Sequence, residues 1–108
     1  MRSKRFEDHL YEKLRDREYA LAYLEAARED GIEEFLYAIR EVASAQEGGF
    51  TRVAEQAGMG RASMYKSLSK RGNPQIRTLD NILGAMGMRF SIASCSTPAS
   101  CDSRQSAE

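Results

Sequence analysis

A short stretch near the middle of the chain, residues 51–68, restricts the fold more than any other part of the sequence. It reads TRVAEQAGMGRASMYKSL, with Ala54 four residues before Gly58. Two short helices that cross steeply accept only a small side chain at their contact, and a glycine adopts the left-handed backbone of a tight turn at little steric cost. The spacing therefore predicts a helix-turn-helix. Apolar residues would line both sides of its turn: Val53, Ala57, Met59, Met64 and Leu68.

The second helix of this unit is expected to run from Arg61 to Leu68. Its outer side would present small and polar side chains: Arg61, Ala62, Ser63, Lys66 and Ser67. A recognition helix offers such a face to the major groove of DNA. The alternative interpretation is an ordinary pair of helices in a small helical domain, because short Ala/Gly patterns also arise by chance.

The distribution of charge favours DNA as the partner of this segment. The whole chain is neutral, with 16 Lys and Arg residues against 16 Asp and Glu residues. Residues 48–77 contain six cations and one anion, a net charge of +5, whereas residues 1–47 contain eight cations and twelve anions, a net charge of −4. Positive charge is thus concentrated where the motif lies, as contact with phosphates requires.

Length and composition limit the chain to a single small domain. It has 108 residues, of which 42% are hydrophobic, and can bury one modest core. No apolar run approaches the roughly 20 residues that span a bilayer, and the N-terminal sequence MRSKRFEDHLYEKL is too charged for a signal peptide. We therefore expect a cytoplasmic protein without a membrane partner.

The sequence contains no arrangement that is typical of an enzyme or a metal site. Cys95 and Cys101 lie too far apart for a CxxC pair and His9 is distant from both, so we expect two free thiols and no metal. Most carboxylates are spaced from cations as on solvated helix faces, and a Gly-rich phosphate loop is absent from the sequence. We expect neither catalysis nor a cofactor.

Hydrophobic periodicity predicts an all-α fold of five helices followed by one short strand. The helices are expected at residues 16–29, 32–46, from 51 onward, 61–68 and 78–86. Helix starts are assigned to Asp16, Thr51, Thr78 and a capping box of Asp30 with Glu33. After Gly87, the alternation of Met88, Phe90 and Ile92 with other residues predicts a strand over 88–93.

The same patterns divide the chain into a charged segment 1–15, a domain 16–93 and a disordered tail 94–108. A single strand needs a partner, so we expect it to pair with the N-terminal segment or with its copy in a second subunit. In the second case Phe90 and Ile92 would supply apolar contacts across a homodimer.

Two segments, AYLEAAREDGIEEFLYAIREVA and, after a short gap, TRVAEQAGMGRASMYKSLSKRGNPQIRTLDNILGAMGMRF, closely resemble HigA-like probable addiction module antidote proteins. The shared pattern covers residues 16–92, and SMYKSLS followed by GNP makes it fairly specific. The positions that match the pattern are Arg61, Ser63, Tyr65, Lys66, Gly72, Asn73 and Pro74. Gly60 departs from it, because serine is commoner there, and this weakens the expected cap of the second motif helix.

The resemblance implies a small λ-repressor-like helix-turn-helix antitoxin. Such a protein neutralises a ribonuclease toxin of the RelE/HigB type and represses its own operon. Its partners would be double-stranded operator DNA, the toxin and a second copy of itself. Motif, charge and resemblance together give the following expected DNA-binding residues: Thr51, Arg52, Arg61, Ala62, Ser63, Tyr65, Lys66, Lys70, Arg71 and Asn73.

Three of these expectations remain open at this point. Tyr65 can contact a phosphate through its hydroxyl or serve only in packing. Toxin contact is expected on the acidic residues 1–47, with Phe6, Leu10, Tyr11 and Leu14 as candidate apolar anchors. The alternative for each of these residues is a place on an ordinary helix face that covers the core. The alternative functions are a transcriptional regulator without a toxin and a helical adaptor that binds other proteins.

Overall fold

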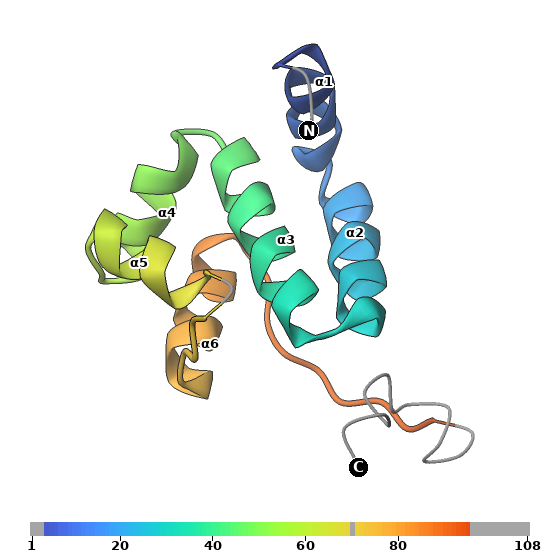
Figure 1. The fold of residues 1–108 in the computed structure, drawn as a ribbon, viewed down its shortest axis with the longest axis vertical. Coiled ribbons are helices and arrows are strands. Elements are labelled where there is room, and N and C mark those ends of the chain that lie inside the picture. Colours follow the sequence, from blue (N-terminus) through green and yellow to red (C-terminus); the bar gives the residue numbers. More distant parts are fainter. Residues whose placement is uncertain (1–3, 70, 96–108) are drawn as a thin grey trace.

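The structure, a computed structural model, describes residues 4–69 and 71–95, the first four of them as backbone only. Within these residues the chain is all helical, as predicted, and contains six helices and no strand. They are α1 (Lys4–Leu14), α2 (Arg17–Asp30), α3 (Ile32–Ala45), α4 (Gly49–Gln56), α5 (Arg61–Ser67) and α6 (Ile76–Ala85), shown in Figure 1.

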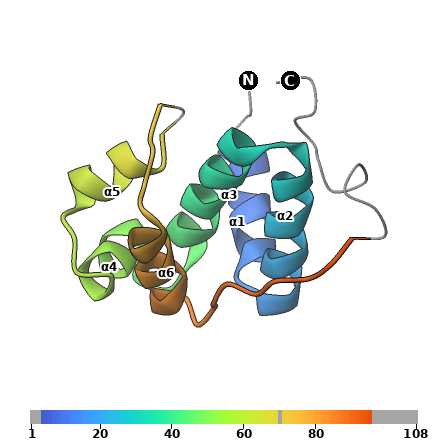
Figure 2. The ribbon, with the colours of Figure 1, turned by 90° about the horizontal axis from the view of Figure 1, so that it is seen from below.

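The six helices form two regions that meet at α3. Helices α1, α2 and α3 lie together on one side, and α4, α5 and α6 lie on the other (Figures 1 and 2). Helix α3 packs against α1 and α2 in the N-terminal region (α1–α3) and against α4 in the C-terminal region (α4–α6). Its spacing of buried Leu36, Ile39, Val42 and Ala43 explains this central place, because these residues form one apolar stripe.

One hydrophobic core extends through both regions. Leu14 of α1, Ile39 of α3, Val53 of α4 and Ile82 of α6 are all fully buried members of it. The C-terminal region therefore does not have a core that is separate from that of the N-terminal region.

The prediction of five helices is wrong, because residues 4–14 form the additional helix α1. This segment is highly charged, so its sequence predicts only a turn or two of amphipathic helix. Leu10 and Leu14, one helical turn apart, are both buried against α2 and α3. Tertiary packing thus stabilises a helix whose sequence is otherwise polar.

Two of the predicted helix starts and the predicted capping box are also wrong. Helix α4 begins at Gly49, so Thr51 lies inside it, and α6 begins at Ile76, so Thr78 lies in its first turn. Threonine is a good N-cap residue, so Thr51 and Thr78 predict starts that are too late. Ile76, where α6 begins, is 71% exposed and adds little to the apolar pattern. Asp30 is the last residue of α2 and Gly31 alone separates α2 from α3, which leaves no room for the capping box.

The turn between α4 and α5 follows the prediction. Gly58 has a φ of +78°, in the left-handed region, and Ala54 is buried where the turn folds back on α4. The amide of Met59 donates to the carbonyl oxygen of Ala54 over 3.0 Å, which closes the turn. Gly60 is the N-cap of α5 and supplies no side-chain hydrogen bond, as expected from a glycine at that position.

The predicted strand over 88–93 is not formed. The amide of Met88 donates to the carbonyl oxygen of Leu83, and the chain then crosses α2 in an irregular path (Figure 2). Met88 packs against the core, and Phe90 lines a hollow together with Leu21 of α2. The alternation in the sequence therefore reflects packing on helices, because a strand also needs a hydrogen-bonded neighbour and none lies beside this segment in the described residues.

The expectation of a free thiol is wrong for Cys95, which is disulfide-bonded. A spacing that excludes a CxxC pair does not exclude a disulfide across a longer loop. Cys101 lies outside the described residues. Each helix in the described part of the chain is too short or too polar to cross a lipid bilayer.

Candidate nucleic-acid interface and acidic groove

Helix α5 exposes the side that the sequence assigned to DNA. Met64 and Leu68 are buried against the core. Since each residue of a helix is rotated by about 100° from the previous one, the opposite side presents Ala62, Ser63 and Lys66, and all three are exposed. Small side chains beside a lysine leave the helix backbone accessible, which is what close approach to a groove requires.

A polar hollow of about 440 Å³ adjoins this side of α5. Four of the expected DNA-binding residues lie around it, namely Ser63, Lys66, Arg71 and Asn73, together with Ser67, Ser69 and Gly72. The structure thus brings together residues from α5 and from the loop that follows it. Two of them are cations, and the hollow contains no carboxylate among its lining residues.

The loop after α5 is shaped by two hydrogen bonds and one glycine. The Ser69 hydroxyl donates to the carbonyl oxygen of Lys66 over 2.8 Å, and the Gly72 amide donates to the carbonyl oxygen of Ser69 over 2.9 Å. A Cβ atom on Gly72 would lie 2.1 Å from the Ser67 carbonyl oxygen. Glycine is therefore required at this position by close approach of the backbone.

Arg61 and Tyr65 belong to a different group, which we call the arginine–aromatic cluster: Tyr37, Arg40, Phe50, Arg61 and Tyr65. The Tyr65 ring is stacked on that of Phe50, with centroids 4.1 Å apart and planes inclined by 22°. The guanidinium carbon of Arg61 lies 4.9 Å from the Tyr65 centroid, and that of Arg40 lies 5.3 Å from the same centroid. The cluster thus joins side chains from α3, α4 and α5.

Thr51 and Arg52 lie apart from both groups, on α4. Thr51 is exposed, whereas Arg52 is half-buried and its Nε donates to the carbonyl oxygen of Glu47. Arg52 lines a hollow of about 700 Å³ together with Arg15, whose Nε donates to the carbonyl oxygen of Ala45 over 3.2 Å. Lys70, also expected to bind DNA, lies outside the described residues.

Sequence reasoning did not select Arg40 or Phe50. Both belong to the arginine–aromatic cluster, although Arg40 comes from the acidic part of the chain. One signal was present in the sequence, since Arg40 is the only Lys or Arg between Arg28 and Arg52. An isolated cation in an acidic segment is a candidate for a specific contact rather than for general solvation.

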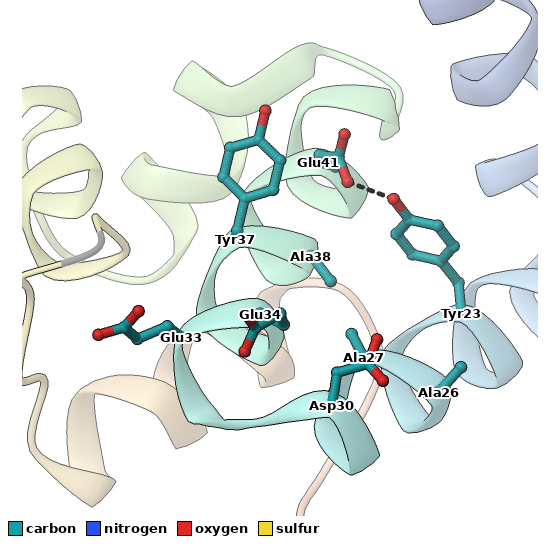
Figure 3. Close-up of a pocket in the computed structure, with 9 residues that line it drawn as sticks. All are labelled: Tyr23, Ala26, Ala27, Asp30, Glu33, Glu34, Tyr37, Ala38 and Glu41. Atoms are coloured by element: carbon teal, nitrogen blue, oxygen red, sulfur yellow. Dashed lines mark hydrogen bonds between the residues drawn. The ribbon is translucent and has the colours of Figure 1, made fainter.

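A second, acidic surface lies between α2 and α3. This acidic groove has a volume of about 480 Å³ and contains four carboxylates and two tyrosines (Figure 3). Its lining residues are Tyr23, Ala26, Ala27, Asp30, Glu33, Glu34, Tyr37, Ala38 and Glu41. Glu41 is only 5% exposed and accepts a hydrogen bond from the Tyr23 hydroxyl. The groove contains no cation among its lining residues, so it suits a positively charged partner.

Two of the residues expected to anchor the toxin are buried and cannot contact it. Leu10 and Leu14 are buried in the core, because α1 turns its apolar side toward α2 and α3. Tyr11 is half-buried and packs against the same core. The side chain of Phe6 lies outside the described residues.

The two residues expected at a dimer contact are exposed to different degrees. Ile92 is 98% exposed, whereas Phe90 is 38% exposed and partly covered by α2. Leu21 of α2 lies in the same hollow as Phe90 and is also among the exposed large apolar residues. Leu21 and Phe90 therefore share one hollow, and the exposed Ile92 follows Phe90 by two residues; we call these three residues the apolar patch.

Comparison with known proteins gives two matches. A family model described as "Probable addiction module antidote protein" matches residues 3–94. A Haemophilus influenzae protein described only as "Uncharacterized protein" is 34% identical over 82 residues, which cover 75% of this chain and 82% of the relative. No solved structure matches the chain.

Proposed function

The chain belongs to the probable addiction module antidote family, and from this premise we propose that it is a DNA-binding antitoxin that represses its own operon. In this proposal the helices α4 and α5 are a HigA-like, λ-repressor-like helix-turn-helix. The toxin that it neutralises is a ribonuclease of the RelE/HigB type. The protein acts in the cytoplasm without catalysis of its own.

The observation that best supports DNA binding is the exposed side of α5 and its adjoining polar hollow. Ala62, Ser63 and Lys66 are exposed, and the hollow brings Arg71 and Asn73 beside them. These residues lie within residues 48–77, whose net charge is +5. In our proposal the small residues and Lys66 face base edges, and Arg71 and Asn73 contact the backbone.

The acidic groove is the proposed site of toxin contact. A ribonuclease needs a cationic surface to hold RNA, and the groove offers four carboxylates without a cation. It lies on residues 23–41, within the acidic part of the chain. The N-terminal region would therefore engage the toxin while the C-terminal region engages DNA.

We further propose a homodimer through the apolar patch of Leu21, Phe90 and Ile92. A small helix-turn-helix binds a half-site, and two copies bind a palindromic operator. Ile92 is almost fully exposed, so a second copy would bury it. Light scattering tests this: dimer at micromolar concentration is expected, and Ile92→Asp should give monomer.

The decisive experiment is a salt-titrated binding assay with the DNA upstream of the gene and a scrambled duplex of equal length. We expect tighter binding to the upstream duplex and a steep loss of affinity as salt rises. Lys66→Ala should reduce the preference between the two duplexes. The matched control is Lys13→Ala, an exposed lysine of α1.

The same experiment separates the alternative functions. Binding to neither duplex would contradict DNA recognition and favour a helical adaptor. Binding without a neighbouring gene for a small basic protein would favour a transcriptional regulator that has no toxin. Co-expression with that neighbouring protein tests neutralisation directly, and its continued toxicity in the presence of this chain would contradict the antitoxin role.

A further inference from the structure

Two arginines from different helices share one aromatic ring in the arginine–aromatic cluster. Arg61 of α5 and Arg40 of α3 have their guanidinium carbons 4.9 and 5.3 Å from the centroid of Tyr65. Arg61 also lies 5.8 Å from the Phe50 centroid, and Arg40 lies 4.8 Å from that of Tyr37. Two positively charged guanidiniums therefore lie close to the same aromatic rings.

The ring that holds them has a fixed position. Tyr65 is stacked on Phe50, which is buried in the core at the start of α4. A guanidinium packed on a ring keeps its N–H groups free to donate at its edge, because only its flat face is occupied. The cluster therefore presents oriented donors rather than two freely moving side chains.

The charge of the two guanidiniums is not neutralised by the protein. Neither Arg40 nor Arg61 forms an ion pair with a carboxylate among the described residues. Gathering two cations without a counter-charge is unfavourable in the free protein. An anion that accepts hydrogen bonds from both would relieve this repulsion, and the planar fork of arginine matches a phosphate in particular.

We propose that Arg40 and Arg61 form a phosphate-binding site for the backbone of duplex DNA, with Tyr65 as the residue that positions both. This rests on the proposed function. It assigns Arg61 to the backbone rather than to a base, and it adds Arg40 of α3 to the DNA contacts. Arg61 and Lys66 are five residues apart, so they leave different sides of α5 and can contact backbone and bases at once.

The test measures binding of Arg40→Ala, Arg61→Ala and Arg17→Ala proteins to the upstream duplex and to the scrambled duplex over a range of salt. Arg17→Ala removes the same charge from an exposed position at the start of α2 and is the control. For Arg40→Ala and for Arg61→Ala we expect equal fold-losses on both duplexes. Each should also reduce the log–log salt slope by about 0.9, the value for one lost phosphate contact.

Three outcomes would overturn the proposal, and each is distinct from failure of DNA binding by the unmodified protein. A loss on the upstream duplex alone for Arg61→Ala would make it a base-reading residue. A salt slope for Arg40→Ala equal to that for Arg17→Ala would remove α3 from the interface. Finally, Tyr65→Leu should cause a loss on both duplexes, and an unchanged affinity would contradict the positioning role. Circular dichroism of each variant verifies that it is folded.

Discussion

The N-terminal and C-terminal regions differ in charge but share one core. Residues 1–47 have a net charge of −4 and residues 48–77 a net charge of +5. Leu14 and Ile82, from opposite ends of the helical part, are nevertheless buried in the same cluster. The comparison indicates that opposite charges are separated along the chain while one core stabilises both regions.

The two regions also differ in the lengths of their helices, and therefore in what stabilises them. Helices α2 and α3 have 14 residues each, whereas α4 and α5 have eight and seven. Helices as short as the latter are not stable alone and depend on packing and on their turns. Substitutions in turns should therefore affect the C-terminal region first, and substitutions in the core should affect both.

The largest expected effect comes from Leu14→Ala, which tests whether the core is shared. The variant leaves a cavity under α1 and should lower the free energy of unfolding by about 2–5 kcal/mol. Urea unfolding followed by circular dichroism should show one transition at a lower denaturant concentration. The exposed neighbour Glu12→Ala is the control. A C-terminal region that unfolds at its original midpoint would show that the two regions are independent.

Gly72→Ala should act first on the loop after α5. Its Cβ would meet the Ser67 carbonyl oxygen at 2.1 Å, so the loop must shift at a cost of about 1–3 kcal/mol. DNA binding should weaken while toxin neutralisation persists. Gly84→Ala is the matched control, because nothing lies within 4 Å of its Cβ position. Gly84 lies inside helix α6, so alanine there should raise the free energy of unfolding by roughly 0.5–1 kcal/mol. Equal DNA binding by both variants would contradict a role for the loop.

Paired charge removal tests whether each region has its own partner. Glu33→Gln together with Glu34→Gln should weaken toxin binding by up to about 1 kcal/mol, mainly through a slower association rate. DNA affinity should change little. Glu55→Gln on α4 serves as the control for removal of an exposed carboxylate. The acidic groove also contains Asp30 and Glu41. Toxin binding that does not change in the Glu33 and Glu34 variant would contradict the groove as the toxin-binding site.

The smallest expected effect is that of Tyr65→Phe, which retains the ring and removes the hydroxyl. Because the ring stacks on Phe50 and holds both arginines, we expect a change in DNA affinity within roughly 0.5 kcal/mol. Fluorescence anisotropy with the upstream duplex measures it. A loss near that of Tyr65→Leu, with a shallower salt slope, would instead assign a phosphate contact to the hydroxyl.

The parts of the fold that were predicted correctly depend on local pattern. The stripe of α3 and the turn at Gly58 follow from spacing and from the conformational freedom of glycine. The strand over 88–93 was predicted wrongly. Alternating apolar residues indicate that one side of the segment is buried, but they do not indicate whether a strand or a helix covers that side. Helix α1 was missed because Leu10 and Leu14 become informative only when α2 and α3 are in place.

The candidate site shows the same limit. Helical period alone placed Ser63 and Lys66 on the outer side of α5, and both are exposed. Arg40 lies 25 positions before Tyr65 in the sequence, so their proximity is a consequence of how α4 packs against both α3 and α5. The acidic groove likewise needs α2 and α3 side by side before Asp30 and Glu41 share a surface.

Helix α3 restricts how this sequence can evolve. Of its 14 residues, one stripe fills the core, another lines the acidic groove and a third reaches the arginine–aromatic cluster. Tyr37 belongs to both of the latter sets. Under the proposed function, a lineage that acquires a different toxin can adjust Glu33 and Glu34, which are exposed, at little cost elsewhere. A change at Tyr37 or Glu41 would instead require compensating changes in neighbouring helices.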